Sequence, residues 1–220
     1  MNLALSQKIT LLTLKPNGKN FLDKELAQIN ILAAALYDLK SSQHIDIDKS
    51  SFTILKENLD DSLIFLTPLF ETLKNLKKKK LKQLTNSFNF SLTNKPGNQL
   101  VASLKASLVE NNLATSDVKQ SLLGKEKTIV LPETSQQEML VAEIKNSLTT
   151  SQIAEDELIL LALFTSSRLA KNYFNSEEMK TAKKVIKTYK DNTSYQSIKT
   201  IIDYHEATVA AAIVAATVQV

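Results

Sequence analysis

Apolar residues recur every three or four positions along most of the chain, the spacing that places them on one face of an α-helix. The first segment with this pattern runs from Leu3 to Leu14 and ends at the turn-forming Pro16-Asn17-Gly18. A second helix follows, for which Asp23 is the expected N-cap. Its expected buried residues are Leu26, Ile29, Leu32, Ala33, Leu36 and Leu39.

The pattern changes in the next part of the chain. His44-Ile45-Asp46-Ile47-Asp48 alternates between polar and apolar residues, which predicts a short strand. Residues Asp60 to Leu84 predict one or two helices that end in a lysine cluster. We expect a break near Thr67-Pro68, because proline removes a backbone donor and restricts the residue before it.

The second half of the chain predicts helices around one hairpin. A helix from Leu100 to Leu113 is followed by extended runs at Ala114 to Leu122 and at Thr128 to Leu131. Two further helix starts are indicated by Ser135-Gln136-Gln137-Glu138, a capping box opening a helix through about Leu148, and by Asn175-Ser176-Glu177-Glu178.

Between these two starts, residues Ile153 to Leu169 contain the run Leu158 to Phe164, which is apolar on every side. A helix of this kind belongs in the centre of a protein. Helices at Ser176 to Lys190 and Ser194 to Thr217 close the chain, and no repeat or linker divides it. We therefore predict a mainly α fold: one compact domain over residues 1–220, built around a central apolar helix, with short β-hairpins.

The composition of the chain argues against several classes of function. The chain has 43% apolar and 23% charged residues, as folded globular proteins do, and only three glycines, none of them in a phosphate-loop or dinucleotide pattern. It has no cysteine and therefore no thiolate site. The longest apolar stretch, Ala207 to Val218, is shorter than the roughly 20 residues that span a bilayer. We expect a cytoplasmic protein without a cofactor.

The charge of the chain comes almost entirely from lysine. The formal net charge is +4, and Arg168 is the only arginine. Lysine suits diffuse attraction toward anionic surfaces, whereas shaped phosphate sites depend more on arginine. The densest basic run comprises Lys74, Lys77, Lys78, Lys79, Lys80 and Lys82. Three interpretations stay open for it: a solvated face, a contact with anionic lipid, or a contact with nucleic acid.

Two groups of residues have side chains suited to metal binding or catalysis. His44, Asp46 and Asp48 alternate as metal ligands on one strand face would, but a half-buried strand explains the same pattern and no second ligand cluster follows. Asp203, His205 and Glu206 could transfer protons, or form a polar patch at the start of the last helix. We therefore expect no metal site at the strand. Because no nucleophile motif accompanies Asp203, His205 and Glu206, we also expect that the protein is not an enzyme.

Several segments in the C-terminal third carry a family resemblance. They are Leu160-Leu161-Ala162-Leu163, the run from Ala182 to Lys187, and the closing run from Ala210 to Thr217. In this order, together with the opening Leu3-Ala4-Leu5 and the middle helix ahead of a hairpin, the chain resembles the Golgi phosphoprotein 3 family. The resemblance covers nearly the whole chain and rests on the order of hydrophobic segments.

The resemblance implies a peripheral membrane adaptor. The eukaryotic members of the family are mostly helical, bind phosphatidylinositol 4-phosphate, insert an apolar hairpin into the membrane and recruit Golgi glycosyltransferases as clients. The head-group site of the family uses a tryptophan, an arginine and a basic pair. Here the tryptophan position corresponds to Phe21, the arginine position falls near Leu32, and the basic pair falls within Glu155 to Leu158, so the phosphate-binding charges are missing.

The membrane hairpin of the family corresponds to Ala170 to Ser176. Tyr173 and Phe174 form an apolar tip there, and Arg168 and Lys171 lie close to it in the sequence. Aromatic rings beside basic residues suit a bilayer interface, although the same rings could pack under the loop instead. We expect weak contact with an anionic or phosphoinositide-like lipid, at the cytoplasmic face of a membrane, without head-group specificity.

A nucleic-acid-binding regulator is the alternative function. The helix from Leu100 to Leu113 followed by a hairpin resembles a winged-helix unit. The expected recognition helix offers Lys105 as its basic residue, with Asn111 and Asn112 at its end. Base recognition usually needs arginine, asparagine or glutamine on one face, so the adaptor interpretation is favoured over this one. The oligomeric state does not follow from the sequence.

Overall fold

The computed structural model describes residues 3–22, 24–48, 50–89, 95–120, 126–150 and 152–189, with residues 203, 207 and 210. Within these residues the structure is mainly α-helical with two small antiparallel sheets, as predicted. The predicted helix at Ser194 to Thr217 and the N-cap Asp23 lie outside the described residues. The prediction of one domain over residues 1–220 stays a prediction.

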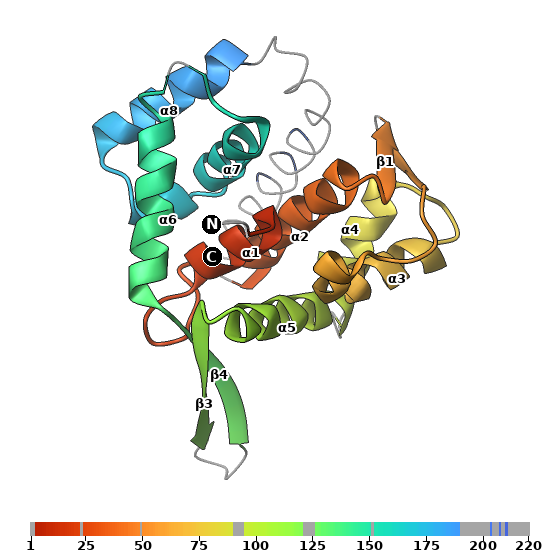
Figure 1. Ribbon diagram of the computed structural model, residues 1–220. Helices are drawn as coiled ribbons and strands as arrows, with labels where there is room; N and C mark the ends of the chain where they lie inside the picture. Colours follow the sequence, from red (N-terminus) through yellow and green to blue (C-terminus); the bar gives the residue numbers. More distant parts are fainter. Residues whose placement is uncertain are drawn as a thin grey trace, which may run out of the picture.

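Helices α1 (Leu5–Thr13) and α2 (Lys24–Ser41) cross at the centre of the described structure (Figure 1). The turn between them contains Gly18, whose φ of +78° is a conformation that favours glycine. A Cβ at Gly18 would also lie 3.0 Å from the carbonyl oxygen of Val130, so the turn packs tightly against the second sheet. Helix α2 was expected to bury one side, yet it is buried on almost every side from Leu26 to Leu39.

The next part of the chain forms one layer beside α2. The strand predicted at His44 to Asp48 is observed as β1 (Ile45–Asp48), and it pairs in a hairpin with β2 (Ser51–Ile54), which was not predicted. The 3-10 helix η1 (Asp61–Leu66) then leads into α3 (Thr67–Asn75), with Pro68 in the first turn of α3, where its missing N–H costs no hydrogen bond. The expected break is therefore confirmed.

The sequence pattern suggested that the helical region ends at the lysine cluster, but the structure continues with another helix. The cluster joins α3 to this helix, α4 (Leu81–Asn89), which buries Leu81, Leu84 and Phe88. Helix α5 (Lys95–Glu110) packs against α1, α3 and α4. The predicted hairpin follows as β3 (Ala114–Gln120) and β4 (Glu126–Pro132), which projects below the helices in Figure 1.

The last described elements form a second helical layer, on the left of Figure 1. They are α6 (Thr134–Ser147), α7 (Glu155–Ser166), the 3-10 helix η2 (Leu169–Asn172) and α8 (Ser176–Tyr189). The predicted start of α8 is confirmed: Asn175 Oδ1 accepts the backbone N–H groups of Glu177 and Glu178, and Glu178 accepts the N–H of Asn175.

The capping box predicted at Ser135 to Glu138 was wrong. Helix α6 begins at Thr134, and its N-cap Glu133 makes no side-chain cap hydrogen bond. Gln137 instead points into the core, where its Nε2 donates to the carbonyl oxygens of Leu11 and Leu14 at 2.7 and 2.8 Å. Its side chain therefore caps the C-terminal end of α1 rather than the start of its own helix.

Helix α7 occupies the centre of the apolar core, as its sequence predicted. Every side chain from Leu158 to Phe164 is buried, and α7 packs against α1, α2, α6 and α8. One cluster of buried apolar side chains includes residues from α1 to α8. Over this run the helix has no solvent-facing side, which explains the absence of any polar residue within it.

We predict that Leu161→Ala lowers the free energy of unfolding by about 2–5 kcal/mol, because it removes buried methyl groups from a side chain that is 0% exposed. Leu55→Ala makes the same chemical change at a side chain that is 55% exposed, and should cost about 0.5 kcal/mol or less. Denaturant unfolding followed by circular dichroism measures both. Equal losses in the two variants would contradict the central position of α7.

Candidate functional site

The aromatic residues predicted to touch lipid point into the core. Phe174 is 7% exposed and contacts Phe164 edge to face, with 5.2 Å between ring centroids. Tyr173 contacts Phe164 and Phe21 at 5.7 and 5.4 Å, and its hydroxyl donates to the carbonyl oxygen of Leu12 at 2.7 Å. Burial raises the pKa of the Tyr173 phenol. The arrangement matches the alternative in which the rings pack under the loop.

The segment around these rings is a single 3-10 turn, η2, and not a hairpin. Arg168 and Lys171 lie on the outside of this turn with exposed side chains. Arg168 adopts a left-handed backbone conformation, with φ of +66°, at the N-cap of η2. These two cations remain available to an anionic partner, but a bilayer contact through Tyr173 and Phe174 would require both rings to leave the core.

The positions expected for the head-group site do not come together. Phe21 contacts Tyr173, which in turn contacts Phe164 near the C-terminal end of α7. Glu155 is the first residue of α7, at the opposite end of this helix. Asp156 and Phe164 are eight residues apart, or about 12 Å along the helix axis at 1.5 Å per residue. Leu32, at the expected arginine position, is 3% exposed within α2. The structure thus provides no basic site from these positions.

A polar cavity of about 320 Å³ lies instead at the N-terminal end of α7. Its lining comes from α1, α2, η1 and α7, and includes Lys8, Tyr37, Asp38, Ser41, Ser62 and Asp156. The Tyr37 hydroxyl donates a hydrogen bond to Asp156, and burial together with this carboxylate raises the pKa of Tyr37. Two carboxylates face one ammonium group here, so the cavity repels a phosphate group.

Asp38 is the buried charge of this cavity. Its side chain accepts the backbone N–H groups of Leu5 at 2.8 Å and Ser6 at 2.9 Å, the first two residues of α1. The carboxylate therefore caps a neighbouring helix, where the positive end of the helix dipole favours it. Burial outweighs these hydrogen bonds and raises the pKa of Asp38 to about 6.

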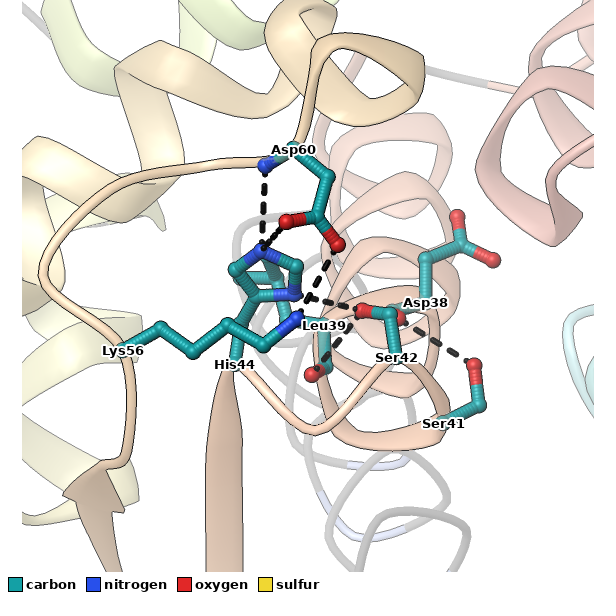
Figure 2. Close-up of polar contacts among 7 residues, drawn as sticks. All are labelled: Asp38, Leu39, Ser41, Ser42, His44, Lys56 and Asp60. Carbon is teal, nitrogen blue, oxygen red and sulfur yellow. Dashed lines mark hydrogen bonds and ion pairs between the residues drawn. The ribbon is translucent and has the colours of Figure 1, made fainter.

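His44 is the second buried ionisable group, and Figure 2 shows its surroundings. The backbone N–H of Asp60 donates to Nε2 at 3.1 Å, and Nδ1 lies 2.8 Å from the hydroxyl oxygen of Ser42. The Ser42 hydroxyl donates at 2.6 Å to the carbonyl oxygen of Asp38. Nδ1 must therefore carry the proton, which fixes one neutral tautomer. Burial, then nearby Lys56, lowers the pKa of His44.

This geometry separates His44 from the carboxylates that follow it in the sequence. Asp46 and Asp48 lie on the exposed face of β1, opposite the buried Ile45 and Ile47. Asp46 pairs with Lys40 at 3.3 Å. No cluster of three acidic or histidine side chains suited to a metal occurs among the described residues. Of the other predicted polar group, His205 and Glu206 lie outside them.

Most of the lysine cluster lies in a fixed loop between α3 and α4, with Lys74 in the last turn of α3 and Lys82 in the first turn of α4. Lys79 Nζ donates to the last carbonyl oxygens of α3, those of Leu73 and Lys74, both at 2.7 Å. The backbone of the loop is bonded to the β1–β2 hairpin: Phe52 N–H donates to the Lys79 carbonyl at 3.0 Å, and Leu81 N–H to the Ser50 carbonyl at 2.9 Å. Lys74 pairs with Glu71 at 3.2 Å.

Four other lysines of the cluster point into solvent: Lys77, Lys78, Lys80 and Lys82. None of their ammonium groups forms an ion pair within the part of the chain that the structure describes. We call residues 76–82 the lysine loop. Its exposed charges are held in place by bonds that involve Lys79 and the loop backbone.

The expected recognition helix has little charge to offer. In α5 the side chains of Leu100, Leu104 and Leu108 face the core, and Lys105 is only partly exposed. Apart from Lys95 in its first turn, the outward residues of this helix include Asn98, Gln99, Ala102, Ala106 and Glu110. A face with this composition gives no support to phosphate binding by α5.

Sequence patterns missed the polar contacts at the C-terminal end of α2. Asp38 lies within the run from Ile31 to Leu39, which is otherwise apolar, and a lone carboxylate in such a run signals a buried partner. Its partners, the first N–H groups of α1, are backbone groups that no residue motif identifies. The Tyr37 contact with Asp156 joins residues 119 positions apart.

Comparison with known proteins identifies one family. The family model described as Golgi phosphoprotein 3 (GPP34) matches residues 5–219, nearly the whole chain. No curated protein sequence matches the chain. In the described residues, no helix has the length and apolar character that crossing a bilayer requires.

The raised pKa of Asp38 predicts how this carboxyl changes stability with pH. Because its folded pKa of about 6 exceeds its usual value of 3.8, the fold favours the protonated form. The resulting stabilisation is present below about pH 4 and is lost as the pH rises through about 6. Relative to Asp38→Asn, the wild-type protein should lose up to about 3 kcal/mol of unfolding free energy between these limits. Parallel pH profiles would contradict the burial of this charge.

His44 should act in the opposite direction. Its folded pKa lies below the ordinary value of 6.5, so its contribution is complete above that value and is lost as the pH falls from there through the folded pKa. We expect wild type to lose stability relative to His44→Asn as the pH falls below 6.5. Thermal unfolding of both proteins at each pH measures the difference. The same pH dependence of stability in wild type and His44→Asn would show that unfolding does not change the pKa of the ring.

Proposed function

Because this chain belongs to the Golgi phosphoprotein 3 family, we propose that it is a non-enzymatic peripheral adaptor that docks on anionic membrane surfaces through its lysine loop. The observation that supports this proposal is that Lys77, Lys78, Lys80 and Lys82 face solvent and form no ion pair with any described residue. Each lysine near an anionic bilayer contributes about 1 kcal/mol of attraction, so four of them give a useful contact without any shaped site.

The rest of the described structure favours charge density over head-group recognition. The positions expected for the phosphate-binding residues are spread over α2, α7 and the loop before α2, and the cavity near α7 is acidic. Lysine ammonium groups are hydrated point charges that attract any anionic lipid in proportion to its charge. The proposed contact is therefore salt-sensitive and similar for phosphatidylserine and for phosphoinositides presented at equal charge.

The position of the loop supports a docking role in a second way. Lys79 and the main chain of the loop are bonded to α3 and to the β1–β2 hairpin, so the lysines project from a fixed backbone. Ordering a flexible segment on binding costs conformational entropy, and a backbone that is already ordered avoids most of that cost. The loop thus combines high charge with a low ordering penalty.

We predict that replacing Lys77, Lys78, Lys80 and Lys82 by glutamine lowers the partition of the protein onto phosphatidylserine vesicles by at least about tenfold at 0.1 M salt, since each of the four lysines contributes up to about 1 kcal/mol. A charge-matched control replaces the exposed lysines Lys19, Lys24, Lys95 and Lys119, which lie on separate elements. The control should lose only about twofold, because scattered charges do not act together on one surface. Liposome co-sedimentation measures both variants.

Three outcomes would overturn the proposal. The first is equal loss in the loop variant and the scattered control. The second is tight, salt-resistant preference for phosphatidylinositol 4-phosphate over vesicles of equal charge. The third is binding to duplex DNA in a mobility-shift assay without binding to vesicles, which would establish the nucleic-acid alternative.

A further inference from the structure

A second row of lysines lies on α8. Lys180, Lys183, Lys184 and Lys187 are spaced so that they fall within an arc of about 100° on the helix surface, over about 10 Å of its length. All four side chains are exposed, and none forms an ion pair within the described residues. We call these four residues the lysine row.

The opposite face of α8 fixes the lysine row in position. Ala182 is fully buried, and Met179, Val185, Ile186 and Tyr189 pack against the core. The Tyr189 hydroxyl accepts the backbone N–H of Ile153 at 3.0 Å, and Glu178 pairs with Lys145 of α6 at 2.9 Å. Because the apolar face of α8 is already used inside the protein, this helix offers a partner charge and no hydrophobic insertion.

The lysine row and the lysine loop lie on different sides of the described structure. Helix α8 packs on α7 and is joined to α6, whereas α3 and α4 pack on α5. In Figure 1, α1 and α2 lie between these two groups, with α8 at the upper left and the loop that joins α3 to α4 at the right edge. The opposite face of α8 packs on α7, so the lysine row faces away from α7 and from the helices that carry the lysine loop. A bilayer that meets one of the two surfaces therefore leaves the other directed toward solvent.

We propose that the protein bridges two anionic bilayers, one bound by the lysine loop and the other by the lysine row. This inference rests on the proposed membrane docking and adds a tethering activity to it. The occupant of the row is argued from charge complementarity. The row lies on a straight helix and has no arginine for bidentate contacts and no exposed aromatic ring for base stacking, which suits the diffuse charge of a lipid surface.

The experiment compares binding with clustering on the same vesicles, made of phosphatidylcholine with phosphatidylserine. Co-sedimentation reports binding, and dynamic light scattering reports clustering. Four full-length proteins are needed: wild type, the loop variant, the scattered control, and a row variant with Lys180, Lys183, Lys184 and Lys187 replaced by glutamine. The wild type and the scattered control should cluster vesicles, and 1 M salt should reverse this clustering.

The loop variant, which binds more weakly, and the row variant should each still co-sediment at high lipid concentration and yet fail to cluster. A variant combining the eight changes should do neither. Wild-type protein that co-sediments without clustering would overturn the inference and leave the proposed function intact, whereas absence of wild-type co-sedimentation would overturn the proposed function itself.

Two further results also count against bridging. A row variant that clusters like wild type would show that the protein joins bilayers as a dimer through one surface. Equal loss of clustering in the row, loop and scattered variants, which all lose four positive charges, would show that clustering follows from charge neutralisation alone. Thermal unfolding of each variant verifies that the fold is retained.

Discussion

Every polar group on a buried helix must find a partner inside the protein, and helix α2 concentrates this constraint. Its carboxylate Asp38 is satisfied by the first N–H groups of α1, and its C-terminal carbonyl at residue 38 accepts the hydroxyl of Ser42. The Ser42 hydroxyl in turn bonds His44, which accepts the N–H of Asp60. One chain of hydrogen bonds thus fixes α1, α2, β1 and the segment before η1 relative to one another.

The periodic parts of this fold could be predicted from the sequence because they depend on local spacing. The all-round apolar run at Leu158 to Phe164, the β1 alternation and the Asn175 cap each contain their own signal within a few residues. Helix α4 was missed because the lysine-rich segment before it resembled the end of a helix. The Ser135 capping box was wrong because Gln137 bonds the distant end of α1, a contact that local sequence does not encode.

The candidate site was harder to predict for the same reason. Tyr173 and Phe174 stand in the sequence beside Arg168 and Lys171, a combination typical of a membrane interface. The two rings point inward because they contact Phe164, Phe21 and the carbonyl oxygen of Leu12, which lie near them only in the folded chain. The exposure of the lysines follows more directly from the sequence, because charged side chains without buried partners remain where their helix face or loop presents them.

The exposed lysines contribute little to the contacts that hold the core together. The ammonium groups of the lysine row make no ion pair within the described structure, and the packing of α8 comes from Ala182 and its apolar neighbours. Substitutions in the row are therefore nearly neutral for folding, while each one changes the surface charge by a full unit. The proposed surface affinity can therefore be adjusted in small steps, one charge at a time, without passing through unstable intermediates.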